Sequence, residues 1–355
     1  MPINESATKA RDIITSYNGS KLRIMEVCGT HTHEIFKLGI RRLLPDSIEL
    51  ISGPGCPVCV TPISYIDEAV MLALDKHVTI TTFGDLIRVP GTEMSLAGAR
   101  SKGAKVNVVY SPLDSLEYAK EHPDEQVVFL AVGFETTTPG NVMSVREAQK
   151  AGAQNFSILT ANKTMFNAYL ALKGSADAFL YPGHVSTMTG MADYYRLRDE
   201  YGISGVVAGF TGSEVLVALA AIIKKVEEGE PFALNCYPAV VTEEGSPTAR
   251  KLVDSLMEPC DSEWRGLGVI KNSGLKLRSE YSEYDARIKF DLPELEGTPN
   301  PACRCGEVLL GKFKPYDCKV FGKGCTPEHP IGACMVSGEG ACSAFYKYGG
   351  DIWNR

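Results

Sequence analysis

Short runs of apolar and β-branched residues alternate with longer segments of helical spacing along most of the chain. The short runs, which predict strands, are 22–27, 47–51, 78–82, 105–110, 126–132, 156–161, 177–181 and 205–209. The longer segments, which predict amphipathic helices, include 63–76, 112–122, 141–152, 163–174, 187–202 and 213–229. Such alternation indicates an α/β protein with parallel sheets that helices cover on both faces.

The alternation fades after about residue 230, and the last 53 residues contain six of the 11 cysteines. A length of 355 residues is enough for two or three domains, each with a core of its own. We therefore expect two parallel-sheet α/β domains around a central cleft, residues 1–130 and 131–235. A small cysteine-rich domain, residues 236–355, should follow them.

Composition and charge exclude several classes of protein. With 44% apolar residues, 22% charged residues and a formal charge of −7, the chain is not a disordered tail protein. No run of Lys and Arg exceeds two residues, so we expect no binding to nucleic acid or to an anionic membrane surface. The chain starts without the features of a signal peptide and has no bilayer-length apolar run, so we expect a cytoplasmic protein.

The loops that follow the predicted strands are rich in glycine and in chemically active side chains. They read CGTHTH (28–33), SGPGCPVC (52–59), FGDLIRVPG (83–91), GFETTTPG (133–140), PGHVS (182–186) and GFTGSE (209–214). Gly and Thr alone would be ordinary turn and cap residues. Because the carboxyl ends of parallel strands meet at one edge, loops that also contain Cys, His, Asp and Glu predict a functional site there.

Three cysteines in these loops are candidate reactive groups. Cys28, beside His31 and His33, could be a soft metal ligand, an activated nucleophile or a small buried side chain. Cys56 and Cys59 form a CxxC between prolines and glycines, before a predicted helix. This position favours a redox dithiol, and the second CxxC of a zinc knuckle is absent.

Further polar candidates lie in the other loops. Asp85, Glu135 and His184 could move protons, and Arg88 could hold an anion through its guanidinium group. GFETTTPG lacks the Lys-Ser/Thr ending of a phosphate-binding loop, so we do not expect it to bind nucleotide phosphates.

The six C-terminal cysteines predict a metal centre. They are Cys303, Cys305, Cys318, Cys325, Cys334 and Cys342. Thiols on Gly- and Pro-rich connections of this length can surround an iron-sulfur cubane, and structural zinc is the alternative. A regular stretch separates the CxC pair from the rest, so we expect the ligands of a 4Fe-4S cluster to be Cys318, Cys325, Cys334 and Cys342.

In this order, and over about residues 20–350, the loop motifs and the C-terminal segment resemble the HypD family of nickel-iron hydrogenase maturation. The resemblance implies two α/β domains around a cleft and a third domain with the 4Fe-4S cluster. It also implies a scaffold that binds a small HypC-type chaperone. On that complex the Fe(CN)2CO group is assembled, with cyanide delivered by a HypE-type partner as an enzyme thiocyanate.

The resemblance also implies roles for individual residues. Cys28 would hold the iron together with a cysteine of the chaperone. Cys56 and Cys59 would be a cleft dithiol that exchanges electrons with the cluster or a partner and helps to release cyanide. The remaining positions that match motifs lining the cleft are His31, Asp85, Glu135 and His184.

Other functions stay open. A stand-alone iron-sulfur thiol-disulfide oxidoreductase would use the CxxC without a partner, but leaves Cys28 and its histidines unexplained. An iron-sulfur hydro-lyase needs an open cluster iron and so only three ligands, whereas the C-terminal segment offers four or more. A structural zinc protein is the simplest alternative. We expect a maturation scaffold with a redox role rather than a metabolic enzyme.

Overall fold

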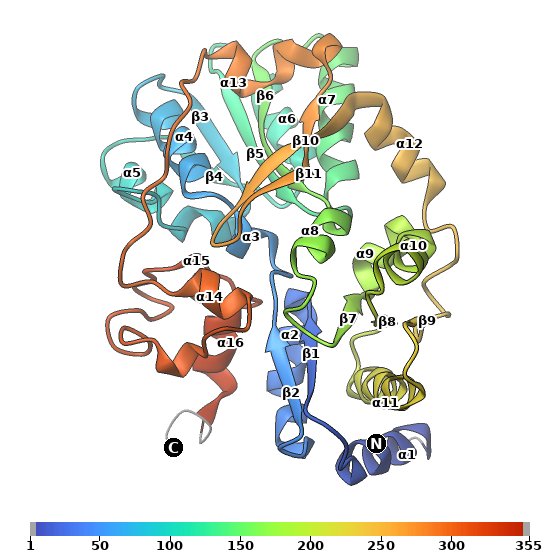
Figure 1. Ribbon diagram of the computed structural model, residues 1–355. Coiled ribbons are helices and arrows are strands. Elements are labelled where there is room, and N and C mark those ends of the chain that lie inside the picture. The colour runs from blue at the N-terminus through green and yellow to red at the C-terminus, as the bar shows by residue number, and fades with distance from the viewer. Residues whose placement is uncertain (1–4, 351–355) are drawn as a thin grey trace.

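The computed structural model describes residues 5–350, and its first sheet has five parallel strands. Their order is β2 (Ile48–Ser52), β1 (Leu22–Glu26), β7 (Ala178–Pro182), β8 (Gly205–Ala208) and β9 (Ala233–Asn235). One face packs against α1 (Glu5–Ser16) and α11 (Gly212–Glu228), which also contact each other at the bottom of Figure 1. Residues of the C-terminal segment pack in the core on the other side.

The second sheet has six strands and lies above the first in Figure 1. Their order is β10 (Met257–Trp264), β11 (Gly268–Leu277), β6 (Phe156–Lys163), β5 (Val127–Gly133), β3 (Thr79–Thr82) and β4 (Val106–Val108). Strands β3 to β6 are parallel, whereas β10 and β11 form an antiparallel hairpin. Alternate residues of β5 enter separate cores on the two faces, as the pleat of a buried strand requires.

Helices and short 3-10 turns (η) connect the strands. They are α2 (Gly29–Lys37), η1 (Ile40–Leu43), α3 (Pro57–Val60), α4 (Ile63–Leu74), η2 (Gly84–Arg88), α5 (Leu96–Ser101), α6 (Pro112–Glu121), α7 (Thr138–Ala151), α8 (Met165–Ala171), α9 (Gly183–Thr189), α10 (Ala192–Tyr201), α12 (Pro247–Leu256), η3 (Ser279–Tyr284), α13 (Ala286–Lys289), α14 (Cys305–Leu309), η4 (Pro315–Asp317), α15 (Ala333–Val336) and α16 (Ala341–Tyr348). None of the helices in residues 5–350 is both long and apolar enough to span a bilayer.

The eight predicted strands and the α/β class are confirmed, with sheets that are mostly parallel. Strands β9, β10 and β11 were not predicted, because their sequences are short or mix apolar and polar residues without a clear period.

The strands are not distributed between the sheets as the expected boundaries require. A boundary at residue 130 falls inside β5, and β1 and β2 join β7 to β9 in the first sheet. The β10–β11 hairpin, expected in a C-terminal domain 236–355, completes the second sheet. Hydrophobic periodicity identifies a strand but not its neighbour, since parallel neighbours are joined by long crossover connections that can pass over other strands.

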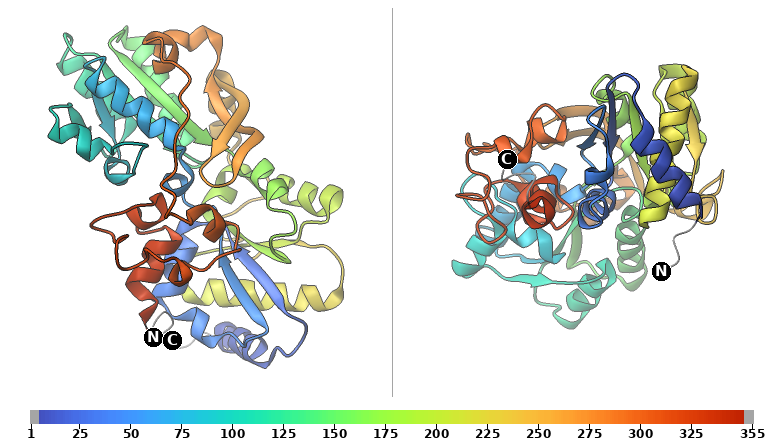
Figure 2. Two further views of the ribbon diagram at one scale, coloured as in Figure 1. Left: turned by 60° about the vertical axis from the view of Figure 1, so that its left-hand side comes forward. Right: turned by 90° about the horizontal axis from the view of Figure 1, so that it is seen from below.

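The C-terminal segment returns to the first sheet. From α13 the chain runs down one side of the molecule to α14, α15 and α16, as Figure 1 shows. Helix α16 packs on α2, α15 on α3, and α14 on β2. Figure 2 shows the same segment beside the N-terminal elements from two further directions. The cysteines of the C-terminal segment are thereby brought to the loops that follow β1 and β2.

Candidate functional site

Cys28 lies between the end of β1 and the start of α2, and it is the N-cap residue of α2. The backbone N–H groups of Thr30 and His31 at the start of α2 favour the thiolate of Cys28, and the residue is 7% exposed. Burial nevertheless raises the pKa of the Cys28 thiol to about 11. The free thiol therefore keeps its proton at neutral pH, and a soft metal that binds it must displace that proton.

Glu339 of the C-terminal segment covers the start of α2. The Thr30 hydroxyl donates a 2.7 Å hydrogen bond to Glu339 Oε1. Gly29 has to be glycine at this point, because a Cβ there would overlap the Glu339 side chain. The negative charge of Glu339 also raises the pKa of Cys28. Glu339 was not predicted from the sequence. The one feature that could have indicated a role is its position inside the cysteine-rich segment.

The CxxC loop lies directly against the backbone of Cys28. Gly29 N–H donates a 3.1 Å hydrogen bond to Gly55 O. A Cβ on Gly55 would overlap the backbone nitrogen of Cys28, so no larger residue fits. The next residue, Cys56, is the N-cap of α3, and both Cys56 and Cys59 are buried. The structure thus brings together the two cysteine motifs that the sequence separates by 27 residues.

His31 and His184 both contact the ring of Phe210. The His31 ring is 4.7 Å from the Phe210 ring, and the His184 ring stacks on the Phe210 ring at 4.0 Å. His31 Nε2 lies 2.9 Å from Gly209 O, and burial lowers the His31 pKa to about 4. Neutral His31 therefore donates from Nε2 and keeps a lone pair on Nδ1, which is buried without a partner. Phe210 was not predicted.

The other polar candidates do not join this group in the same way. Asp85 is half-buried in η2, and within residues 5–350 its carboxylate makes no hydrogen bond or ion pair. Arg88 instead binds backbone carbonyls of the C-terminal segment, Pro327 O at 2.9 Å and Val336 O at 3.4 Å. Glu135 follows β5 and accepts a 2.7 Å hydrogen bond from Met165 N–H.

The carboxylate of Glu135 is buried although the residue as a whole is only half-buried. Its Oε2 has no hydrogen-bond partner, and burial raises the pKa to about 7. Below pH 4.5 the group is protonated in both folded and unfolded chains and costs nothing. Above pH 7 it is ionised in both, and the cost to the folding free energy is roughly 3 kcal/mol.

The parent protein should lose stability as pH rises from 4.5 to 7, because Glu135 ionises. We predict that Glu135→Gln does not lose this stability. The variant should be more stable than the parent by up to about 3 kcal/mol at pH 8 and equal to it at pH 4, as measured by urea unfolding. Glu147→Gln, an exposed position on α7, should change stability by less than about 0.5 kcal/mol at either pH. Equal effects of the two substitutions at pH 8 would contradict the prediction.

A connected group of thiols extends from the CxxC into the C-terminal segment. The Cys59 thiol interacts with its neighbours Cys56 and Cys334, and the Cys334 thiol also interacts with that of Cys305. The Cys305 and Cys59 thiols favour the thiolate of Cys334 and lower its pKa to about 6. All cysteines are free. We call Cys56, Cys59, Cys334 and Cys305 the thiol chain.

The four C-terminal cysteines that we expected to act together do not all lie in this group. Cys342 interacts with the neighbouring Cys305 thiol, and Cys325 Sγ accepts a 3.3 Å hydrogen bond from Ile331 N–H. Cys318 is half-buried and contacts Ala302 O at 3.8 Å.

The CxC pair, which we expected to be separate, lies at the thiol chain itself. The sulfurs of Cys303 and Cys305 both lie against Gly332, since a Cβ on Gly332 would overlap them. Helix α14, which begins at Cys305, is only five residues long and folds back on β2, so it does not separate the pair from the other cysteines.

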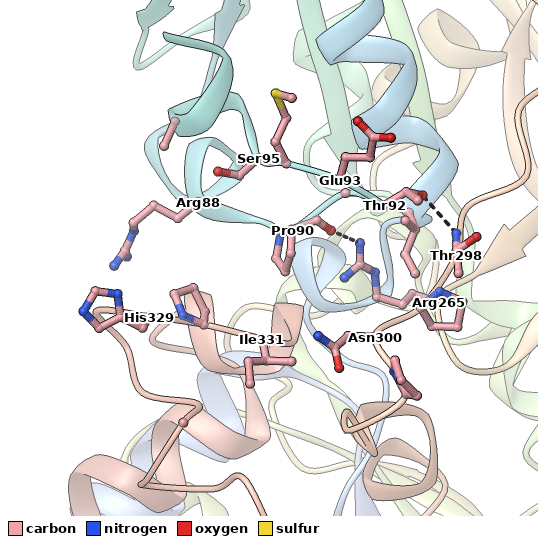
Figure 3. A pocket seen from close by; sticks show the side chains of 18 of the residues that line it. Arg88, Pro90, Thr92, Glu93, Ser95, Arg265, Thr298, Asn300, His329 and Ile331 are labelled. Atoms are coloured by element: carbon pink, nitrogen blue, oxygen red, sulfur yellow. Dashed lines mark hydrogen bonds between the residues drawn. The ribbon is translucent and has the colours of Figure 1, made fainter. Parts of the chain in front are cut away.

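Two adjoining cavities lead from the surface to this end of the thiol chain. The larger, of about 780 Å³, lies between residues 88–97 and the C-terminal segments 298–301 and 324–331. Figure 3 shows Arg88, Arg265 and His329 among its lining side chains. The smaller, of about 350 Å³, shares Arg265 and Asn300 with it and reaches Cys303 and Cys305.

Comparison with known proteins identifies the family. A family model named HypD, with the description "Hydrogenase formation hypA family", matches residues 4–349. The chain belongs to the HypD family. It is 43% identical over 338 residues to "Hydrogenase maturation factor HypD" of Azotobacter vinelandii, covering 92% of this chain and 89% of that protein. It is 42% identical to the protein of that name from Escherichia coli, covering 94% of this chain and 91% of that protein. It is also 42% identical to the protein of that name from Rhodobacter capsulatus, covering 93% of this chain and 90% of that protein.

Membership in the HypD family confirms the resemblance that the motifs indicate and assigns the chain to hydrogenase maturation. In this HypD chain the cysteine motifs near residues 28 and 56 lie next to part of the C-terminal segment, because α16 packs on α2 and α15, which contains Cys334, packs on α3.

Proposed function

We propose that this HypD-family protein is the scaffold on which the Fe(CN)2CO group of nickel-iron hydrogenases is assembled. In this proposal Cys28 holds the iron, with a further ligand from a HypC-type chaperone, and a HypE-type partner delivers cyanide. The observation that carries the proposal is the direct backbone contact between Cys28 and the CxxC loop. Because of that contact, Cys28 lies beside the loop that contains Cys56 and Cys59, which supports the proposal.

The environment of Cys28 suits an iron cargo. A thiolate is a soft ligand for iron, and the N–H groups of Thr30 and His31 stabilise its negative charge. The pKa near 11 keeps Cys28 protonated until iron arrives, which protects it from oxidation.

The adjacent dithiol can supply electrons for cyanide release. An enzyme thiocyanate, R–S–C≡N, accepts two electrons and two protons and becomes R–SH and HCN. If Cys56 and Cys59 supply the two electrons and the two protons, their sulfurs form a disulfide bond, so atoms and electrons balance. Reduction of that disulfide by the Cys334 and Cys305 thiols then transfers the oxidation along the thiol chain.

The cysteines that remain fit an iron-sulfur cluster. If Cys305 and Cys334 act as a dithiol, four C-terminal cysteines are left: Cys303, Cys318, Cys325 and Cys342. Four thiolates are the number that a 4Fe-4S cluster takes, and Cys303 and Cys342 adjoin Cys305. In the described residues no three His, Cys, Asp or Glu side chains are arranged around a single metal ion. A cluster bound there would supply single electrons, and we propose this set, with Cys303 in place of the expected Cys334.

We predict that Cys56→Ser reduces cyanide transfer to background in a reaction reconstituted with a HypE-type thiocyanate donor. The hydroxyl cannot form the disulfide, so the two electrons cannot be supplied. The measurement is cyanide transferred per mole of protein under anaerobic conditions. Cys260→Ser, at a half-buried thiol in β10, should transfer cyanide like the parent. Parent-like transfer by Cys56→Ser would exclude the dithiol as electron source.

The scaffold itself is tested by the infrared spectrum of the anaerobically purified complex with the HypC-type chaperone. Cyanide and carbonyl stretches from iron support it. A complex with an intact cluster, coexpressed with the maturation enzymes, that shows neither stretch contradicts it. A stand-alone oxidoreductase would instead turn over small disulfides without a partner, but Cys56 and Cys59 are only 4% and 1% exposed.

A further inference from the structure

Lys163 is a buried lysine at the end of β6, and the whole residue is only 1% exposed. Its Nζ donates hydrogen bonds to Ser262 Oγ at 2.6 Å and to Glu263 O at 2.5 Å, both on β10. Nζ also lies 5.2 Å from the centre of the Trp264 ring. Neither the iron site nor the redox steps proposed above use this amine.

Both hydrogen-bond acceptors of Lys163 are uncharged groups. An ammonium group has three N–H donors, whereas a neutral amine has two N–H donors and a lone pair. Two acceptors match the neutral amine, and no carboxylate of residues 5–350 forms an ion pair with Nζ. Burial lowers the pKa of Lys163 to about 7, although the charge of Glu263 acts in the opposite direction. At neutral pH a large share of the molecules therefore has a nucleophilic amine at this position.

A cavity of about 200 Å³ adjoins this amine. It lies between the start of α4, the end of β6 and the β10–β11 hairpin, and both Lys163 and Ser262 line it. Gly274 of β11 keeps this side of the cavity open, since a Cβ there would overlap Ser262 Cβ and lie 3.1 Å from Cys260 Sγ. A water molecule takes about 30 Å³ in the liquid, so the cavity suits a molecule of a few non-hydrogen atoms.

Two further cations line the cavity. Arg287 donates to the Glu68 carboxylate at 3.0 and 2.7 Å and to Thr160 O at 3.0 Å. Within the described part of the chain these bonds use three of its five N–H groups and leave two for a ligand. The Lys276 ammonium lies 3.2 Å from Glu258, and its side chain is 55% exposed. These cations favour a ligand that has a carboxylate.

Two carboxylates also line the cavity, and each has a partner. Asp261 Oδ1 accepts a 3.0 Å hydrogen bond from Asn272 N–H, and Glu263 Oε2 accepts one of 3.4 Å from Ser64 Oγ. Both acidic residues are exposed. Water therefore screens their repulsion of a bound carboxylate.

We propose that Lys163 is a nucleophilic amine that forms an imine with a small α-oxo acid in this cavity. The amine nitrogen bonds to the carbonyl carbon, and the carbonyl oxygen leaves as water with the two amine hydrogens, so no oxidant or reductant is needed. Arg287 and Lys276 bind the carboxylate. The reaction does not involve the thiol chain, none of whose four cysteines lines the cavity.

The test is reductive trapping in the full-length, anaerobically purified protein. Glyoxylate is added at pH 7 with cyanoborohydride, which reduces the imine to a stable carboxymethyl group, and the modified lysines are mapped by mass spectrometry. Lys163 should be modified at least about tenfold faster than Lys276, whose ammonium is paired with Glu258. Lys289 is the matched comparison, because burial also lowers its pKa but it does not line the cavity. It should likewise be modified at least about tenfold more slowly than Lys163.

A second aldehyde tests the class of ligand. Acetaldehyde has no carboxylate, so the preference for Lys163 over Lys289 should fall at least about threefold when it replaces glyoxylate. Equal preference with the two aldehydes overturns the assignment to an α-oxo acid. Modification of Lys163 no faster than that of Lys289 overturns the whole inference. All lysines are measured in one sample of the parent protein, so the result does not depend on the folding of a variant, and neither outcome affects the proposed scaffold.

Discussion

Cys28→Ala is expected to remove both the cyanide and the carbonyl stretches from the infrared spectrum of the complex with the HypC-type chaperone. In the proposed scaffold the sulfur of Cys28, between β1 and α2, is the atom that binds iron, and alanine offers no ligand in its place. The His31 Nδ1 lone pair cannot substitute, because its ring is fixed by the hydrogen bond to Gly209 O and by the contact with Phe210. We expect loss to below about a tenth of the parent intensity, because one of the proposed protein ligands is removed outright.

The substitution should leave the fold intact. Alanine is smaller than cysteine and keeps the backbone contact with the CxxC loop, in which Gly29 N–H bonds Gly55 O. Cys236→Ala, at a half-buried thiol after β9, is the matched control and should keep both stretches. Retention of the stretches in Cys28→Ala, with equal protein and chaperone content, would show that another residue holds the iron.

Arg41→Met is expected to destabilise the protein by about 3–5 kcal/mol, the largest stability effect that we predict. Glu26, in β1 two residues before Cys28, is fully buried, and Arg41 donates to its Oε1 at 2.7 Å. Arg41 also donates to Leu50 O and Ser52 Oγ on the neighbouring strand. Methionine can keep the packing on Phe36 but leaves the Glu26 carboxylate without its counter-ion.

Urea unfolding at pH 7 measures this effect. Combining Arg41→Met with Glu26→Gln removes the uncompensated charge and should recover part of the loss. Arg23→Gln provides the contrasting control, because the Arg23–Asp177 pair is exposed and should contribute less than about 1 kcal/mol. Loss of less than 1 kcal/mol in Arg41→Met would mean that Glu26 is neutral in the folded protein.

The predicted strands and the cysteine motifs are the parts of this protein that local sequence determines. A buried parallel strand is a short apolar run, and each of the eight predicted runs forms a strand. The loops after these strands contain Cys28, Cys56 and His184, which the sequence correctly places at strand ends. Their position follows from chain order alone.

Neighbours that are distant in the sequence could not be predicted. The pairing of β1 with β7, and the return of the C-terminal segment to α2 and α3, depend on surfaces that become complementary only after folding. This is why the sheets do not follow the expected boundary at residue 130. It is also why Glu339, Phe210 and Arg265 were missed, since each acts on a residue more than 170 positions away.

The sequence by itself therefore determined the α/β class, the strands and the family-specific thiols, because periodicity and motif chemistry are local properties of a chain. The tertiary structure decided which thiols lie together. Cys334, which we expected to act with the other three of the last four cysteines, interacts with Cys59 and Cys305. The tertiary structure also decided which charged side chains lie near these thiols. Burial and charge interactions depend on distance in space, and an apolar pattern contains no information about the distance between two loops.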